Sequence, residues 1–343
     1  MKHKYIIGSI QAGETAVNNV STKLGLSDYL GAVIVRWGIN RNNYKVNPGL
    51  YSVGSPDNTS DVFVTANYKL SFDHLRKNLN GIDGWILVLD TKGVNVWCAA
   101  GKGTFGTDEL NDRIKRVSLD KVVSHRRIIL PQLGATGVAA HRIKDGSGFN
   151  VKYGPVRAAD IKEFLNSGYQ ATGEMRKVNF RFWDRIKLIP NDFMYGKFYL
   201  IGALFVIFLL SSFHIGQFSP VTSMNRGLTR MFNVFAAYFS GIVITPALLP
   251  YIPVRRFYLK GFITGALTVI ILFLLNKTGS DIFEKISWFF IIPAVSSFMA
   301  MNFTGSSTFT SLSGVKKEMK TAVPFQILFL SVGLILFITG LFI

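Results

Sequence analysis

The chain has 343 residues, a formal net charge of +18 and one cysteine. A single cysteine excludes an intrachain disulfide, a cysteine-only zinc site and an iron-sulfur cluster held by this chain alone. A basic chain can bind nucleic acid, but the amino-terminal half has no stripe of lysine and arginine interleaved with aromatic residues. We therefore predict no nucleic-acid partner.

Charge separates the chain into two halves. Residues 1–190 carry 27 lysines and arginines against 16 acidic residues, mixed with apolar runs of strand and helix length. The remaining residues carry 11 against 4, and nearly all of these lie between long apolar stretches. We predict an α/β domain over residues 1–172, a basic amphipathic linker over 173–195 and a membrane domain over 196–343.

Short apolar strands alternate with amphipathic helices in the first domain. We expect strands over 61–65, 85–90, 94–97, 127–130 and 149–153, and helices over 71–80, 106–117, 137–144 and 157–167. This alternation predicts a sheet covered by helices on its faces. Ligands of such sheets bind in the loops that follow the carboxyl ends of the strands.

Five later segments are apolar enough to cross a bilayer, which takes about 20 residues per span. We expect the spans at 196–214, 231–250, 257–275, 286–304 and 322–342. With the α/β domain inside, inner loops hold Arg255, Arg256, Lys260, Lys316, Lys317 and Lys320, and outer loops hold Arg226, Arg230, Lys277 and Lys285. This bias predicts a multi-pass protein of the inner, cytoplasmic membrane with its soluble domain in the cytoplasm. The basic and aromatic segment 178–189 suits either a helix on the anionic inner surface or a plain linker.

The run Val94-Asn95-Val96-Trp97-Cys98-Ala99-Ala100-Gly101-Lys102 contains the cysteine at an expected change from strand to helix. A lone cysteine beside apolar residues is most often a structural core residue. The small residues that follow it would clear one helix face, as a large flat macrocycle requires for its metal to approach the sulfur.

A dinucleotide site is the competing interpretation of this segment. Gly101, Gly103 and Gly106 spell G-x-G-x-x-G before an expected helix. In the dinucleotide fold, however, the first glycine directly follows the strand, and an acidic residue ends the next strand about 20 residues on. Neither condition is met, which disfavours a nicotinamide or flavin enzyme.

The run from Asn95 to Lys102 closely resembles the cap-helix signature of the mercury-methylating corrinoid proteins, which are related to the corrinoid iron-sulfur proteins of the acetyl-CoA pathway. The resemblance extends over residues 65–73, 131–141 and 153–161, and the five-span tail is similar to the mercury-methylating proteins in particular. It implies a Rossmann-like corrinoid-binding domain, with cobalamin as cofactor and its cobalt bound by Cys98. The implied cofactor-binding residues are Thr65, Asn67, Asn95, Val96, Trp97, Cys98, Ala99, Ala100, Gly101, Lys102, Gly134, Ala135, Thr136, Gly137, Tyr153 and Gly154.

Two absences distinguish this chain from other corrinoid proteins. The motif Asp-x-His-x-x-Gly, by which methionine-synthase-like proteins supply a histidine to cobalt, is missing, since His74 directly follows Asp73. The cysteine cluster of the acetyl-CoA-pathway subunit is missing as well. We interpret His125 and His141 as hydrogen-bonded surface residues and not as metal ligands.

The resemblance implies a corrinoid-dependent methyltransferase in which the Cys98 thiolate is the lower axial ligand of cobalt. A thiolate is a softer and stronger donor than imidazole, so the methyl group would leave with its bonding electrons to Hg(II), giving methylmercury. The implied partners are a ferredoxin-like protein with two iron-sulfur clusters and a methyl-folate-type donor or its methyltransferase. Two alternatives remain open: a membrane-anchored methyl carrier of acetyl-CoA-pathway type, and a corrinoid-binding protein without catalysis.

Overall fold

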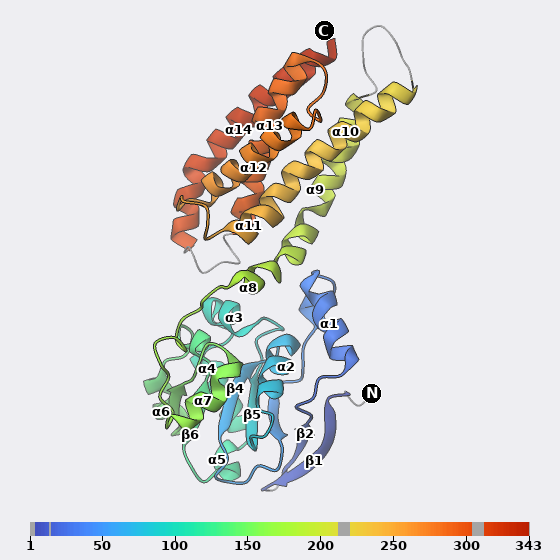
Figure 1. Cartoon of the computed structure of the whole chain (residues 1–343). Coiled ribbons are helices and arrows are strands. Elements are labelled where there is room, and N and C mark those ends of the chain that lie inside the picture. Colours follow the sequence, from blue (N-terminus) through green and yellow to red (C-terminus); the bar gives the residue numbers. More distant parts are fainter. Residues whose placement is uncertain (1–3, 14, 212–219, 304–311, 343) are drawn as a thin grey trace. The chain divides into compact units, whose positions relative to one another are not determined.

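The computed structural model describes residues 4–13, 15–211, 220–303 and 312–342 (Figure 1). The chain forms two compact units, Met1–Val178 and Asn179–Ile343, which we call the α/β unit and the helical unit. Each unit is described by itself. The division between them lies inside the segment 173–195.

A seven-stranded sheet in the order β1-β2-β3-β5-β4-β6-β7 forms the centre of the α/β unit. The strands are β1 Ile6–Ala12, β2 Thr15–Val20, β3 Gly49–Val53, β4 Val62–Ala66, β5 Gly84–Leu89, β6 Arg127–Leu130 and β7 Asn150–Tyr153. Strands β5, β4, β6 and β7 are parallel. β3 pairs antiparallel with β5, and β1 pairs antiparallel with β2.

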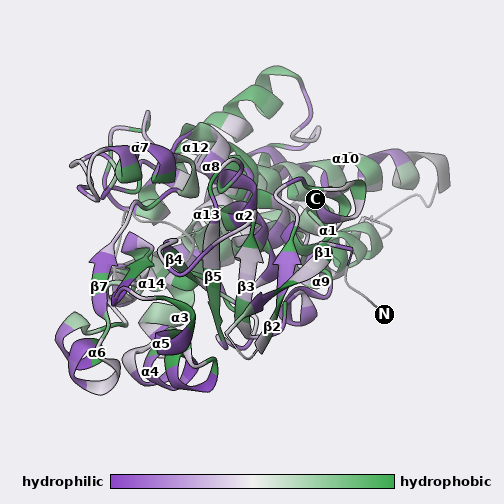
Figure 2. Ribbon diagram, turned by 90° about the horizontal axis from the view of Figure 1, so that it is seen from below, coloured by the Kyte–Doolittle hydropathy of each residue, from purple (hydrophilic) through white to green (hydrophobic). Residues whose placement is uncertain are grey.

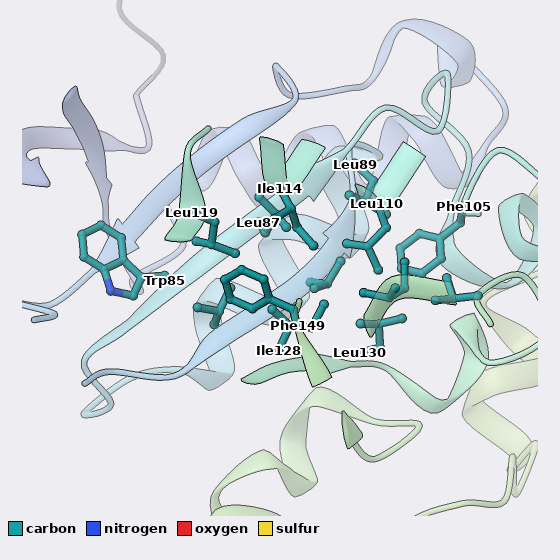
Figure 3. Close-up of a cluster of buried hydrophobic side chains, with 14 of the residues drawn as sticks. Trp85, Leu87, Leu89, Phe105, Leu110, Ile114, Leu119, Ile128, Leu130 and Phe149 are labelled. Atoms are coloured by element: carbon teal, nitrogen blue, oxygen red, sulfur yellow. The ribbon is translucent and has the colours of Figure 1, made fainter. Parts of the chain in front are cut away.

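Helices cover both faces of this sheet. They are α1 Leu26–Arg36, η1 Arg41–Asn43, α2 Lys69–Asn78, α3 Val96–Lys102, α4 Thr107–Arg116, α5 Leu119–Val122, η2 Gln132–Gly134, α6 Ala140–Ser147, η3 Ala158–Asp160 and α7 Ile161–Asn166. One hydrophobic cluster joins β4, β5 and β6 to helices α3 to α6 (Figure 3). A second cluster joins the opposite face to α2 and α7. All six residues of β5 are buried, and Figure 2 shows this strand as hydrophobic.

The expected α/β sheet followed by apolar helices is confirmed, with one clear error near the cysteine. The strands expected at 61–65, 85–90, 127–130 and 149–153 correspond to β4, β5, β6 and β7. The strand expected at 94–97 is wrong, because helix α3 already begins at Val96. The side chain of Asn95 accepts a hydrogen bond from the Cys98 N–H at 3.0 Å, and such a cap stabilises a helix start.

The helical unit consists of α8 Phe182–Ile186, α9 Ile189–Leu210, α10 Pro220–Phe239, η4 Ser240–Ile244, α11 Thr245–Leu248, α12 Phe257–Leu274, α13 Ile282–Asn302 and α14 Leu312–Phe342. Among the described residues, five helical segments are long and apolar enough to cross a membrane: Phe182–Leu210, Met224–Leu248, Phe257–Leu274, Ile282–Asn302 and Gly314–Phe342. They overlap the five expected spans. The expected span ends at 212–214 and 304 lie outside the described residues.

Two cations expected in loops are buried within helices instead. The Arg230 guanidinium in α10 donates to both carboxylate oxygens of Glu284 in α13, at 2.8 and 2.9 Å. The Lys260 ammonium in α12 donates to the carbonyl oxygens of Leu249 and Ile252. A charge buried among apolar helices is costly unless it is paired in this way.

The segment 178–189 is also bound to the helical unit. The Arg185 guanidinium is buried and donates to the carbonyl oxygens of Pro246 and Ala247. One of the cations that would face an anionic membrane surface in the first of the two interpretations therefore binds helix carbonyl oxygens within the protein.

Candidate functional site

The candidate site is the outer face of helix α3, which follows β5 on the chain. Asn95 caps the start of this helix, and Gly103, with a φ of +81°, ends it in the left-handed conformation that glycine adopts readily. Local sequence thus accounts for a helix of seven residues. Cys98 occupies its third position, and its side chain is exposed.

The small residues that follow Cys98 were expected to clear one face of the helix, and only one of the three does so. Ala99 and Ala100 are buried in the cluster that fills one face of the sheet, so they allow close packing and do not clear the outer surface. Gly101 does lie outside, one turn after Cys98. A Cβ atom added at Gly101 would meet nothing within 4 Å, so the surface beside the sulfur is open.

Trp97 and Lys102 flank this open surface. Trp97 is 40% exposed and does not belong to the core. Lys102 is exposed, while Val96 points inward. The outer face of α3 therefore presents one thiol, one indole and one ammonium around a glycine.

Asn67 fixes the loop that leads into α3. Its side-chain oxygen accepts hydrogen bonds from the Thr91 N–H, the Thr91 hydroxyl and the Gly93 N–H, at 3.1, 2.8 and 2.9 Å. Its amide nitrogen donates to Asp90 at 3.1 Å. Because Asn67 is only 2% exposed and its oxygen accepts three hydrogen bonds, it positions the loop, and its contact with a cofactor stays a prediction.

Asp90 and Glu109 complete this loop, and the sequence analysis did not identify them. The Asp90 N–H donates to the Glu109 carboxylate at 2.8 Å, and the Asp90 carboxylate accepts from the Lys92 N–H and ammonium. Burial alone would raise the pKa of Asp90, but its bonds to Lys92, the charge of Lys92 and the bond from Asn67 lower the pKa below its ordinary value of 3.8. The position of Asp90 directly after a buried strand was the available sequence signal.

Helix α3 packs against η2, which lies in the loop after β6. A Cβ atom at Gly137 would collide with the Phe105 carbonyl oxygen and would lie 3.0 Å from the Cα atom of Ala100. A Cβ atom at Gly134 would lie 2.5 Å from the Phe105 ring. These two glycines thus permit the close approach of loop and helix.

Other expected site residues of these loops differ in exposure. Thr136 is exposed and Ala135 is partly exposed, so both remain accessible from solvent. Thr65 is buried, and by strand alternation it faces away from Val64 and Ala66, which pack in the same cluster as α3. The structure does not bring Thr65 to the outer face of α3.

Tyr153 and Gly154 end the last strand. The Tyr153 hydroxyl donates to the Val138 carbonyl oxygen at 2.7 Å, which ties β7 to the loop after β6. Burial raises the pKa of Tyr153, so the hydroxyl stays neutral and able to donate. Gly154 is buried, and a Cβ atom there would lie 3.1 Å from the Ile129 side chain. Both residues support the loops in this structure.

The donor set at this site is a single sulfur. Among the described residues, no group of three or more His, Cys, Asp and Glu side chains could hold a metal ion. His125 bonds to the Ser60 carbonyl oxygen and accepts from the Arg127 N–H, as expected for a hydrogen-bonded residue, and His141 is exposed. A metal at Cys98 must therefore bring its other ligands with it. A corrinoid, which carries its own ligands for cobalt, would meet that condition, and a Cβ atom added at Gly101 would have no neighbour within 4 Å to block its approach.

The dinucleotide interpretation is excluded by the positions of the three glycines. Gly101 lies inside α3, Gly103 is the residue after its end, and Gly106 precedes α4. The motif therefore joins two helices, whereas a dinucleotide fingerprint joins a strand to a helix.

Residues 38–165 match the family model described as the CO dehydrogenase/acetyl-CoA synthase delta subunit. The acetyl-CoA decarbonylase/synthase complex subunit gamma of Archaeoglobus fulgidus is 31% identical over 131 residues, which are 38% of this chain and 27% of that protein. The corrinoid/iron-sulfur protein large subunit of Moorella thermoacetica is 31% identical over 125 residues, which are 36% of this chain and 28% of that protein.

The chain thus spans just over a quarter of the length of these curated relatives. The family match contains Cys98, helix α3 and the loops around it. The part of the chain that carries the candidate site is therefore similar to subunits of the acetyl-CoA pathway, one of which is named for a corrinoid.

Proposed function

We propose that this chain is a membrane-anchored, corrinoid-dependent methyltransferase that uses Cys98 as its cobalt ligand and Hg(II) as methyl acceptor. The observation that carries the proposal is the exposed thiol of Cys98 beside the open surface at Gly101. The similarity of residues 38–165 to acetyl-CoA-pathway subunits supports a corrinoid as the group that binds there.

One group of residues in this chain would contact the cofactor, and a second group would position the first. The Cys98 sulfur would bind the cobalt, and Trp97, Lys102 and Thr136 are the exposed neighbours able to contact the macrocycle or its side chains. Asn67, Gly134 and Gly137 keep α3 and its loops in place. When bound, the corrinoid would supply a methyl group on cobalt that a soft, electron-poor acceptor such as Hg(II) can take.

The proposal requires partners. The chain has one cysteine and cannot hold an iron-sulfur cluster by itself, so electrons that return the cobalt to its reduced form would come from another protein. We propose a ferredoxin-like protein with two iron-sulfur clusters for this role, and a methyl-folate-type donor or its methyltransferase as the methyl source. Hg(II) is the substrate, and the soluble unit lies on the cytoplasmic side of the inner membrane.

The test uses the purified full chain in lipid nanodiscs, loaded with methylcobalamin. We expect a shifted visible spectrum for the wild type and for the exposed control His141→Ala, and no shift for Cys98→Ala or Cys98→Ser. Addition of Hg(II) should then release methylmercury, measured by mass spectrometry, faster from the first two proteins than from the Cys98 variants or from free methylcobalamin. Failure of the wild type to bind the corrinoid, or an unchanged spectrum in Cys98→Ala, would overturn the proposal.

A methyl carrier of acetyl-CoA-pathway type is the second candidate, because the curated relatives are named for that pathway. It requires the same cobalt ligation by Cys98. A shifted spectrum without methyl transfer to Hg(II) would favour the carrier. Methylmercury release at a rate well above that of free methylcobalamin would favour the methyltransferase.

A further inference from the structure

Helix α1 carries an apolar stripe that faces solvent. Five large side chains recur at helical spacing, and each is between 46% and 74% exposed: Leu26, Tyr29, Leu30, Val33 and Ile34. We call this stripe the outer face of α1. In the part of the chain that the structure describes, none of these five residues belongs to a hydrophobic cluster. Soluble surfaces rarely leave so continuous an apolar patch uncovered, and such patches mark interaction sites.

The inner side of α1 is firmly attached to the α/β unit. The Asp28 carboxylate accepts from the Lys69 ammonium at 2.6 Å and from the Arg76 guanidinium at 2.8 Å. Val35 is 1% exposed, and a Cβ atom at Gly31 would lie 2.5 Å from the Tyr44 hydroxyl oxygen. The outer face is therefore displayed by a helix whose orientation is fixed, and it is not a badly packed part of the core.

The charges beside the outer face are positive. A shallow hollow of about 540 Å³ adjoins Leu26 and Leu30, and Lys4, Lys23 and Ile7 also line it. Asp28 lines the same hollow, but its charge is neutralised by Lys69 and Arg76. Four aliphatic residues and a tyrosine, flanked by Lys4 and Lys23, match the surface of an anionic lipid leaflet.

The rest of the chain supplies the second argument for lipid. Helical segments apolar enough to cross a membrane begin at Phe182, four residues after the α/β unit ends at Val178. A unit tethered so closely to membrane spans meets lipid at a high effective concentration, without any further binding partner. A soluble protein partner would have to compete with that surface.

We propose that α1 lies in the plane of the membrane surface, with its outer face inserted among anionic phospholipids. The apolar side chains occupy the boundary between headgroups and acyl chains, about 5–10 Å deep as in other interfacial helices. Lys4 and Lys23 bind lipid phosphate at the rim. The α/β unit is then held to the membrane at α1 as well as through its connection to the helical unit.

The test measures the surroundings of single spin labels in the full chain. In a Cys98→Ala background, Leu30→Cys places a label on the outer face of α1, and Tyr29→Cys provides a second label there. Lys144→Cys on helix α6 is the control, since it is also exposed and helical. In nanodiscs with anionic lipid, we expect labels at 29 and 30 to collide with oxygen more often, and with a water-soluble nickel complex several-fold less often, than the label at 144.

Four results would contradict the proposal. Equal access of the nickel complex to positions 30 and 144 would mean that the outer face is in water. Protection of position 30 from both reagents would mean that protein covers it, whether a second copy, a partner or the helical unit. Equal insertion in purely zwitterionic lipid, or no weakening by the double substitution Lys4→Gln and Lys23→Gln, would refute the anionic contact.

Discussion

The position of Cys98 depends on residues that never reach the surface beside it. Asn67 binds the loop before α3, and Gly137 allows the loop after β6 to touch Ala100. Neither role could be assigned from the sequence, because each depends on contact between segments far apart in the chain. The cysteine itself could be identified, since its motif is local.

Gly137→Ala tests whether the close contact between α3 and the loop after β6 positions Cys98. The added methyl collides with the Phe105 carbonyl oxygen and must displace the helix, at a cost of about 1–3 kcal/mol for overpacking. We expect weaker cobalamin binding in an absorbance titration and faster hydrogen exchange in residues 96–102. Gly8→Ala is the matched control, because a Cβ atom there meets nothing within 4 Å. Identical binding by the two variants would show that this contact does not position Cys98.

Asp90 gives the loop before α3 a defined pH dependence. Because its pKa in the folded chain is lowered, its carboxylate stabilises the loop fully above the ordinary value of 3.8 and loses this effect as pH falls through the lowered value. We expect constant protection of residues 90–96 from about pH 5 to 8 and a loss well below that range, after correction for intrinsic exchange rates. Asp90→Asn should reduce protection near neutral pH and abolish the acid step. A step that persists in this variant would assign it to another group.

Helix α1 and helix α2 are joined by a network of buried charges. Arg76, which is fully buried, donates to Asp73 and Asp28 and to the carbonyl oxygens of Ser21 and Lys23. The network fixes the orientation of α1 and therefore of its outer face. Because the network holds α1 in this orientation, the apolar stripe on its outer face stays exposed.

Arg76→Met should be severely destabilising. It removes the more deeply buried of the two cations that Asp73 and Asp28 share, Lys69 being the other, and loss of one partner from a buried charge pair costs about 3–5 kcal/mol. Denaturant titration of the full chain, followed through hydrogen exchange in β5 and α1, measures the effect. Lys77→Met, at the next and exposed position of α2, should change stability little. Similar stabilities of the two variants would contradict the importance of the network.

Secondary structure could be predicted from the sequence where a strand is buried along its whole length. The prediction failed where a strand depends on its pairing with a neighbouring strand. Strands β4 and β5 are buried along their whole length, and their apolar runs predict them well. The first sixty residues were not assigned, since β1 and β2 contain glycine and asparagine and depend on pairing with each other. Helix α3 was mistaken for a strand at its start because Val94 and Val96 alternate with polar Asn95, whose capping role requires the helix to be known.

At the scale of the whole molecule, the number of spans determines on which side of the membrane each end of the helical unit lies. Five segments long and apolar enough to cross are found among the described residues, and an odd number places the start of the first and the end of the fifth on opposite sides. Arg255 and Arg256 lie between the second and third segments, and Lys316 and Lys317 lie near the start of the fifth. Lysine and arginine in short loops favour the cytoplasmic side, so we predict that the α/β unit lies on that side too.

Reporter fusions test this arrangement in cells. Alkaline phosphatase, which requires an oxidising compartment, should be active when fused after Ile343 and inactive when fused at Met1. A fluorescent protein that matures only in the cytoplasm should give the reverse pattern. Substituting Arg255, Arg256, Lys316 and Lys317 with glutamine should weaken the orientation and produce mixed activity, because it removes the charges that set it. Phosphatase activity at Met1 in the unaltered chain would place Cys98 outside the cytoplasm, away from cytoplasmic ferredoxin-like and folate-type partners, and would refute the proposed electron and methyl supply.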